Sequence, residues 1–239
     1  MASNSEKGHA KNVANLQRLI SFCNGYGAQY NPTQPAIKIP AMQALLTASN
    51  NSLIAVNTAL TPWKVAVNMR QIAFETLRPT CTRVINALDA CGASGAIVKD
   101  GRTYVRKISG KRVSAATPTA ADAAGTSAVQ RSFDAQVANF QSFISLLTGE
   151  PLYIPNESPL QIVQLNTYLT QLQTANTNVI NTLTPWSNAR VSRNNILYAP
   201  STGLVDVALE SKKYIKSVFG ASSPQYKQVS GLEFSRVRD

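Results

Sequence analysis

Two stretches of the chain share one spacing of apolar residues, which constrains the fold more than any other sequence feature. Counted back from Leu60 and from Leu183, apolar positions recur in alternating steps of three and four, with one polar residue in each series. The two series are Ile39, Met42, Leu46, Ser49, Leu53, Val56, Leu60 and Ile162, Leu165, Leu169, Leu172, Asn176, Val179, Leu183. Such steps place side chains along one face of an α-helix. We therefore expect helices over residues 39–60 and 162–183, each with a narrow apolar seam.

Both series end in the sequence Leu-Thr-Pro-Trp, at residues 60–63 and 183–186, which contain the only two tryptophans of the chain. Threonine is a favourable N-cap, and proline suits the first position of a helix. Each of the two Leu-Thr-Pro-Trp sequences therefore predicts a turn that ends one helix and begins a second, antiparallel helix beside it. The expected second stripes are Trp63, Val67, Arg70, Phe74, Leu77 and Trp186, Arg190, Arg193, Leu197.

The resemblance between the two halves extends beyond these words. Residues 13–16 (VANL) recur as residues 137–140 (VANF), and a proline-marked break at Pro79 recurs at Pro200. The sequence IVKDGRTYV holds two β-rich runs around Asp100-Gly101, a strong hairpin signal. We predict a mainly α protein, a tandem duplication of an antiparallel four-helix bundle, each copy followed by a short β-hairpin or β-tail. The expected domains are a first bundle with its β-tail (1–112), a flexible Ala/Thr/Ser-rich linker (113–129) and a second bundle with its β-tail (130–239).

The segments KGHAKNVANL, GYGAQYNP and SPQYKQVSGLEF resemble sequences of an uncharacterised family of internally duplicated helical-bundle proteins from Bacteroidetes. The resemblance extends along the chain and implies a duplicated helical fold of a bacterial protein. It implies no activity, because none of these segments is a motif tied to one.

The residue types that carry most catalysis are scarce. His9 is the only histidine, and its place before the first apolar stripe is typical of an exposed or helix-capping residue. Cys23, Cys81 and Cys91 are odd in number and scattered, which favours reduced thiols, and no Gly-rich phosphate-binding motif occurs. We expect no catalytic residue, cofactor or metal. The competing hypothesis is an enzyme with a site between the two copies.

The net charge of +11 lies almost entirely in the first half, where residues 1–120 carry 14 Lys/Arg against 4 Asp/Glu. Its densest part comprises Lys99, Arg102, Arg106, Lys107, Lys111 and Arg112. This segment either binds nucleic acid or another polyanion as a β-ribbon with a basic face, or is a solvated surface.

Four residues recur at matching places of the second stripes: Trp63 with Trp186, and Arg70 with Arg193. They are read as structural seam residues, with an anion site at the two arginines as the alternative. The best reading is a non-enzymatic binding or scaffolding module with an unidentified protein partner. Because neither a signal sequence nor an 18-residue apolar run is visible, we expect a cytoplasmic protein without a membrane span.

Overall fold

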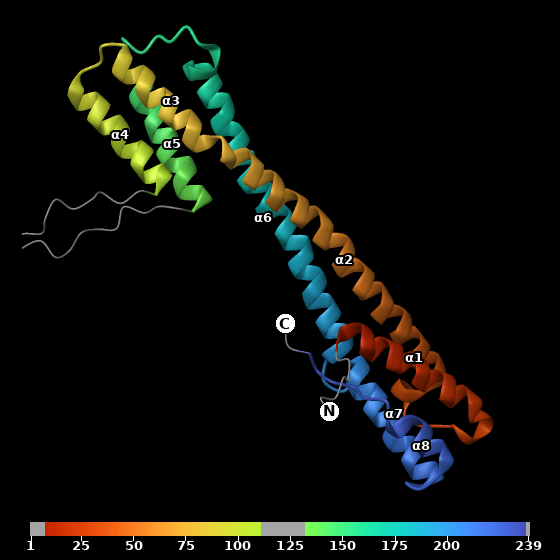
Figure 1. The fold of residues 1–239 in the computed structure, drawn as a ribbon. Coiled ribbons are helices and arrows are strands. Elements are labelled where there is room, and N and C mark those ends of the chain that lie inside the picture. The colour runs from red at the N-terminus through yellow and green to blue at the C-terminus, as the bar shows by residue number, and fades with distance from the viewer. Residues whose placement is uncertain (1–7, 111–131, 238–239) are drawn as a thin grey trace, which may run out of the picture. The chain divides into compact units, whose positions relative to one another are not determined.

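The computed structural model describes residues 8–110 and 132–237, and within these ranges no residue lies in a β-strand. Figure 1 shows the α-helices and their order along the chain. They are α1 (His9–Gly25), α2 (Ile39–Glu75), α3 (Leu77–Ala90), α4 (Gly95–Ser109), α5 (Phe133–Thr148), α6 (Ile162–Tyr198), α7 (Leu204–Phe219) and α8 (Pro224–Ser230). Short 3₁₀ turns η1 (Gly27–Gln29), η2 (Pro35–Ile37) and η3 (Ser158–Leu160) lie in the loops. The predicted mainly α class is confirmed.

The two predicted seams are helical along their whole length, as expected. In α2 the seam residues Met42 and Ser49 are fully buried, and in α6 Leu172 is. The seam is less covered toward the middle of α6, where Leu183 is 41% exposed.

The predicted turn at Leu-Thr-Pro-Trp is wrong, because Pro62 and Pro185 lie inside the continuous helices α2 and α6. The two helices that we expected on either side of each proline are therefore one helix of 37 residues. Proline removes one backbone hydrogen bond and crowds the preceding turn, a penalty of about 3 kcal/mol. A long helix with a buried seam on both sides of the proline can absorb that penalty.

The predicted hairpin at Asp100-Gly101 is also wrong, because these residues lie within α4. Ser94 caps this helix by accepting a hydrogen bond from the Ile97 N–H at 3.4 Å, and Gly110 ends it with a left-handed φ of 64°. Gly101 is buried and serves close packing, since a Cβ there would lie 2.7 Å from Cδ1 of Ile85. Its lack of a side chain reflects a tight helix contact and not a turn.

The second predicted β-tail is likewise not a strand. Residues 224–230 form α8, which Ser223 caps through the Tyr226 N–H at 3.1 Å. Residues 232–237 follow without regular secondary structure.

The chain divides into two compact units that do not follow the predicted domains. Unit 1 comprises Met1–Pro62 and Leu183–Asp239, and unit 2 comprises Trp63–Thr182. Each unit therefore takes helices from both halves of the chain, and α2 and α6 contribute residues to both units. The predicted linker 113–129 lies outside the described residues.

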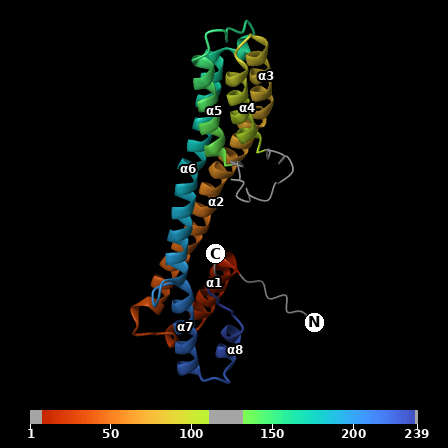
Figure 2. The ribbon, with the colours of Figure 1, turned by 90° about the vertical axis from the view of Figure 1, so that its left-hand side faces the viewer.

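Each unit has its own apolar core. In unit 1, α7 contacts α1, α8 and η2. Figure 2 shows α1 and α8 beside α7. Buried residues such as Leu16, Leu197 and Leu204 belong to the core of this unit. In unit 2, α4 contacts both α3 and α5 (Figure 2), and η3 contacts α3. Phe140 and Phe143 are the largest fully buried side chains of that core. No helix among the described residues is both long and apolar enough to cross a lipid bilayer.

Candidate functional site

Four of the six predicted anion-binding cations lie on α4, and Lys111 and Arg112 lie outside the described residues. Lys99, Arg102 and Arg106 are exposed and spaced by three and four residues, which puts them on one face of the helix. Lys107 is half-buried, with its ammonium 5.7 Å from the Tyr104 ring centroid. The basic segment is thus a helical stripe instead of a β-ribbon.

Two of these cations already have partners within the unit. Arg102 forms an ion pair with Asp89 of α3 at 2.7 Å, and Arg106 donates to the Thr103 hydroxyl at 2.9 Å. Both groups of the Arg102–Asp89 pair are more than half exposed, so water screens their attraction. The stripe keeps a positive face, of which Asp89 neutralises a part.

The two repeated arginines have different surroundings. Arg70 in unit 2 is half-buried, and its guanidinium carbon lies 4.1 Å from the Phe133 ring centroid. Arg193 in unit 1 is only 6% exposed, and its Nε and Nη2 donate to the Asn194 side-chain oxygen at 3.1 and 2.8 Å. The Arg70 guanidinium lies over a ring while its buried Nε has no hydrogen-bond partner among the described residues, whereas hydrogen bonds hold the Arg193 guanidinium.

The repeated tryptophans are half-buried. Trp63 belongs to unit 2 and Trp186 to unit 1, where the Arg190 guanidinium carbon lies 5.0 Å from the Trp186 ring centroid. Neither tryptophan lines the groove that is described below.

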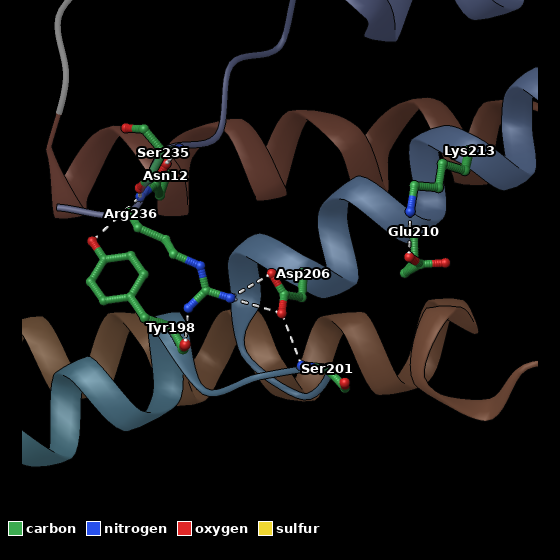
Figure 3. A network of polar contacts seen from close by, with 8 residues as sticks. All are labelled: Asn12, Tyr198, Ser201, Asp206, Glu210, Lys213, Ser235 and Arg236. Atoms are coloured by element: carbon green, nitrogen blue, oxygen red, sulfur yellow. Dashed lines mark hydrogen bonds and ion pairs between the residues drawn. The ribbon is translucent and has the colours of Figure 1, made fainter.

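A network of polar contacts in unit 1 holds the C-terminal segment (Figure 3). Nη2 of Arg236 lies 2.8 Å from both carboxylate oxygens of Asp206, and Arg236 also donates to the Tyr198 carbonyl. The Asp206 carboxylate accepts the Ser201 N–H at 2.9 Å. That N–H, followed by the Arg236 guanidinium, holds the pKa of Asp206 below its ordinary value. Asp206 therefore links the start of α7 to the end of the chain.

The first helix holds the same segment through two asparagines. Asn12 donates to the Ser235 carbonyl at 2.7 Å, and Asn15 donates to the Glu233 carbonyl at 2.7 Å. His9, the first residue of α1, lies with its Nδ1 2.7 Å from the Tyr198 hydroxyl. These polar groups hold the C-terminal segment against α1, so the role of the network is structural; we call it the C-terminal clasp.

An open groove lies in unit 2, between the C-terminal half of α3 and the loop that precedes α6. Its volume is about 570 Å³, which falls within the about 300–1,000 Å³ typical of ligand sites. The lining residues are Arg83, Asn86, Ala87, Ala90, Cys91, Tyr153, Ile154, Pro155, Asn156, Glu157 and Leu160. Sequence reasoning missed this site, although the loop PLYIPNESPL was visible as a break rich in proline.

Tyr153 forms a fixed wall of the groove. Only 5% of it is exposed, and its hydroxyl donates to the Leu160 carbonyl at 2.8 Å. Burial, with smaller effects of Cys91 and Glu157, raises the pKa of Tyr153 to about 12, so the hydroxyl stays protonated at neutral pH. The loop is further braced where Glu150 accepts the Leu152 N–H at 3.1 Å. The ring is therefore held in place before anything binds.

The rim of the groove carries two charged side chains without an ionic partner among the described residues. Arg83 on α3 and Glu157 in the loop are both exposed, and neither forms a hydrogen bond or ion pair through its side chain with the described residues. Beside them the loop exposes two apolar side chains, Leu152 at 54% and Ile154 at 79%. A groove with an apolar floor, open charges and an exposed apolar edge has the anatomy of a binding site.

Known proteins add no assignment to this geometry. The resemblance to duplicated bacterial helical bundles remains an expectation. No protein-family model, curated protein or solved structure matches the chain.

Proposed function

We propose that the protein is a non-enzymatic binding module that receives a segment of a partner protein in the groove of unit 2. The observation that carries this function is the groove of about 570 Å³. At its rim Arg83 and Glu157 have no ionic partner among the described residues, and beside it Ile154 is 79% exposed. A partner segment would cover the apolar edge and pair with these charges.

The side chains in the groove support binding more than catalysis. The nucleophile types among them are Cys91, Glu157 and the buried Tyr153, and the Cys91 thiol is turned to the Leu88 carbonyl at 3.1 Å. The single histidine of the chain, His9, belongs to unit 1, so unit 2 contains no histidine that could act as a base for Cys91. Asn86 and Asn156 offer neutral hydrogen-bonding groups, which suit recognition.

Site-specific photo-crosslinking tests this function. A photoreactive amino acid at Asn86, inside the groove, is compared in the host cell with the same amino acid at Thr82, an exposed residue of α3 outside the groove. We expect a discrete crosslinked partner at position 86 only, and its loss when Ala87→Tyr fills the groove. Equal crosslinking at both positions, or crosslinking unaffected by Ala87→Tyr, would refute the function.

A second candidate function is polyanion binding by the helical stripe of α4. The observation that favours it is the alignment of Lys99, Arg102 and Arg106 on one exposed face, with Lys107 beside them. Aligned cations at helical spacing can follow a row of phosphates. Arg102 must share its charge with Asp89, which weakens this candidate relative to the groove.

We also propose that the chain is a tandem duplication. This is supported by the bounds of α2 and α6, which have the same length and differ by 123 positions at both ends, and by η2 and η3, which differ by the same number. Homologues that carry one copy would test it, since their single copy should align with both halves.

A further inference from the structure

We propose that the groove of unit 2 binds an aromatic side chain, tyrosine or phenylalanine, of a partner polypeptide that carries a carboxylate beside it. This inference rests on the proposed function and names the ligand class. It follows from a comparison within the molecule: at the corresponding place in unit 1, the protein's own helix supplies the aromatic ring.

The helices α3 and α7 correspond in their fully buried positions. Each begins with a fully buried leucine, Leu77 or Leu204. The following fully buried positions are displaced by the same number, 127, in both helices. The matched pairs are Leu77 and Leu204, Cys81 and Ala208, Val84 and Ser211, and Leu88 and Ile215. Because four buried positions agree, the exposed positions between them can be compared as well.

The loops that face these helices correspond too. Tyr30 in unit 1 and Tyr153 in unit 2 are each 5% exposed. Tyr30 donates its hydroxyl to the Ile37 carbonyl at 2.7 Å, as Tyr153 does to Leu160 at 2.8 Å. η2 contacts α7 and η3 contacts α3, so each loop packs on the matching helix. The two buried tyrosines thus form the same wall in both units.

What differs is the residue opposite that wall. In α7 the residue is Tyr214, whose ring meets the Tyr30 ring edge-on with centroids 5.3 Å apart, and whose hydroxyl accepts the Asn31 N–H at 3.2 Å. In α3 the matching residue is Ala87, which lines the groove. Among the described residues no aromatic ring packs against Tyr153. In unit 1 the Tyr214 ring packs on Tyr30, whereas in unit 2 the matching tyrosine, also only 5% exposed, lines a groove that no aromatic ring of the described residues fills.

The charge at the rim changes in the same comparison. Arg83 of α3 occupies the position of Glu210 in α7, which pairs with Lys213 at 2.8 Å. Arg83 has no such partner in the described protein. A guanidinium one helical turn before Ala87 can pair with a carboxylate that lies next to a ring seated on Ala87.

The aromatic ring must come from another molecule. The residues outside the described ranges, 1–7, 111–131 and 238–239, contain no phenylalanine, tyrosine or tryptophan. These segments cannot supply the ring, and a partner polypeptide with an aromatic residue beside an acidic one is the occupant that the groove fits.

A display library of random peptides, panned on the full chain and on Ala87→Tyr, tests the inference. Peptides that bind the full chain and not Ala87→Tyr occupy the groove, because the substituted residue reproduces the tyrosine of α7. Ala90→Phe is a second blocking variant, and circular dichroism confirms that each variant folds. We expect the groove ligands to be enriched in tyrosine or phenylalanine next to aspartate or glutamate.

Titration of one enriched peptide then measures each contact. Replacement of its aromatic residue by leucine should weaken binding about twofold to tenfold, the range that an aromatic pair contributes beyond buried area. Arg83→Gln should weaken binding of the acidic peptide, whereas Arg102→Gln, a cation removed outside the groove, should not.

The outcomes separate the ligand class from the function. Groove ligands without aromatic residues would overturn the aromatic inference and leave the binding module standing. A library that yields no peptide sensitive to Ala87→Tyr or to Ala90→Phe would overturn both. Aromatic ligands insensitive to Arg83→Gln would overturn the carboxylate beside the ring.

Discussion

Asn12 and Ser235 bond each other twice: the asparagine Nδ2 donates to the serine carbonyl at 2.7 Å, and the serine N–H donates to the asparagine Oδ1 at 3.1 Å. Asn12 is 2% exposed, so its partners would be poorly solvated without it. We expect Asn12→Ala to lower the free energy of unfolding by about 1–3 kcal/mol, the penalty for leaving buried polar groups unpaired. Urea denaturation measures it, with Gln17→Ala, an exposed position of the same helix, as the control. Equal stability of the two variants would contradict the C-terminal clasp.

The carboxylate of Asp206 should make stability depend on acid pH. Its pKa is lowered in the folded protein by the Ser201 N–H and by Arg236. A lowered folded pKa means that the stabilisation is complete above the unfolded pKa of about 4 and is lost as the pH falls through the folded value. We therefore expect Asp206→Asn to destabilise the protein at pH 7 and to differ little from the wild type near pH 2. Unfolding curves across this pH range measure the difference in the free energy of unfolding between Asp206→Asn and the wild type, with Glu210→Gln for comparison. A difference that stays constant with pH would contradict this prediction.

Gly101 should not tolerate a methyl group, although it lies inside a helix. A Cβ there would lie 2.7 Å from Ile85 Cδ1 and 3.2 Å from Phe143 Cε2. Overpacking costs about 1–3 kcal/mol, whereas alanine gains about 1 kcal/mol in helix propensity over glycine. We expect Gly101→Ala to lower the melting temperature. Gly95→Ala, in the first turn of the same helix with open space around it, should not. If Gly101→Ala raised the melting temperature as well, the close packing of α4 would be wrong.

Pro62 should weaken α2, and its replacement should strengthen that helix. Pro62→Ala supplies an N–H that can bond the Thr58 carbonyl and removes the ring from the preceding turn. We expect a gain of at most about 3 kcal/mol, with slower amide hydrogen exchange on both sides of the substitution. Pro79→Ala is the matched control, because Pro79 lies in the first turn of α3, where proline costs little. Unchanged exchange in Pro62→Ala would argue against a continuous helix.

The α4 stripe gives a quantitative prediction for the second candidate function. If Lys99, Arg102, Arg106 and Lys107 all contact duplex DNA phosphates, the slope of log affinity against log salt should be about −3.6, from about −0.9 per contact. Glutamine at these four positions should flatten the slope and leave helix content unchanged, whereas loss of Lys38 and Lys64 outside α4 should not. Absence of binding at low salt would reduce the stripe to a solvated surface.

The helical class and both seams could be predicted because heptad spacing is a local property of the sequence. The same spacing also indicates that each helix continues through its Leu-Thr-Pro-Trp sequence. The alternating steps of three and four run without interruption from Ile39 through Leu60 and Trp63 to Phe74, which is typical of one helix. The cap and proline signals predicted a turn, which is wrong, because the stabilisation from burying the seam exceeds the penalty of a single proline.

The α4 error has a different physical origin. Asp-Gly is a good hairpin turn in isolation, and only the close approach of Ile85 shows why a glycine is needed at position 101. The groove was beyond sequence reasoning for a similar reason. It depends on the packing of Tyr153 against α3 and on the absence of a ring at Ala87, and both are tertiary relationships.

The division of the chain into units has a consequence for its synthesis. Unit 2 is one uninterrupted stretch, Trp63–Thr182, whereas unit 1 joins Met1–Pro62 to Leu183–Asp239. A ribosome therefore delivers all of unit 2 before α7, which packs against α1, has been made. During that interval the apolar side chains of α1 that end fully buried, such as Leu16 and Leu19, lack the part of their core that α7 provides. We expect unit 2 to fold first, and α1 to be the segment of the nascent chain that chaperones hold.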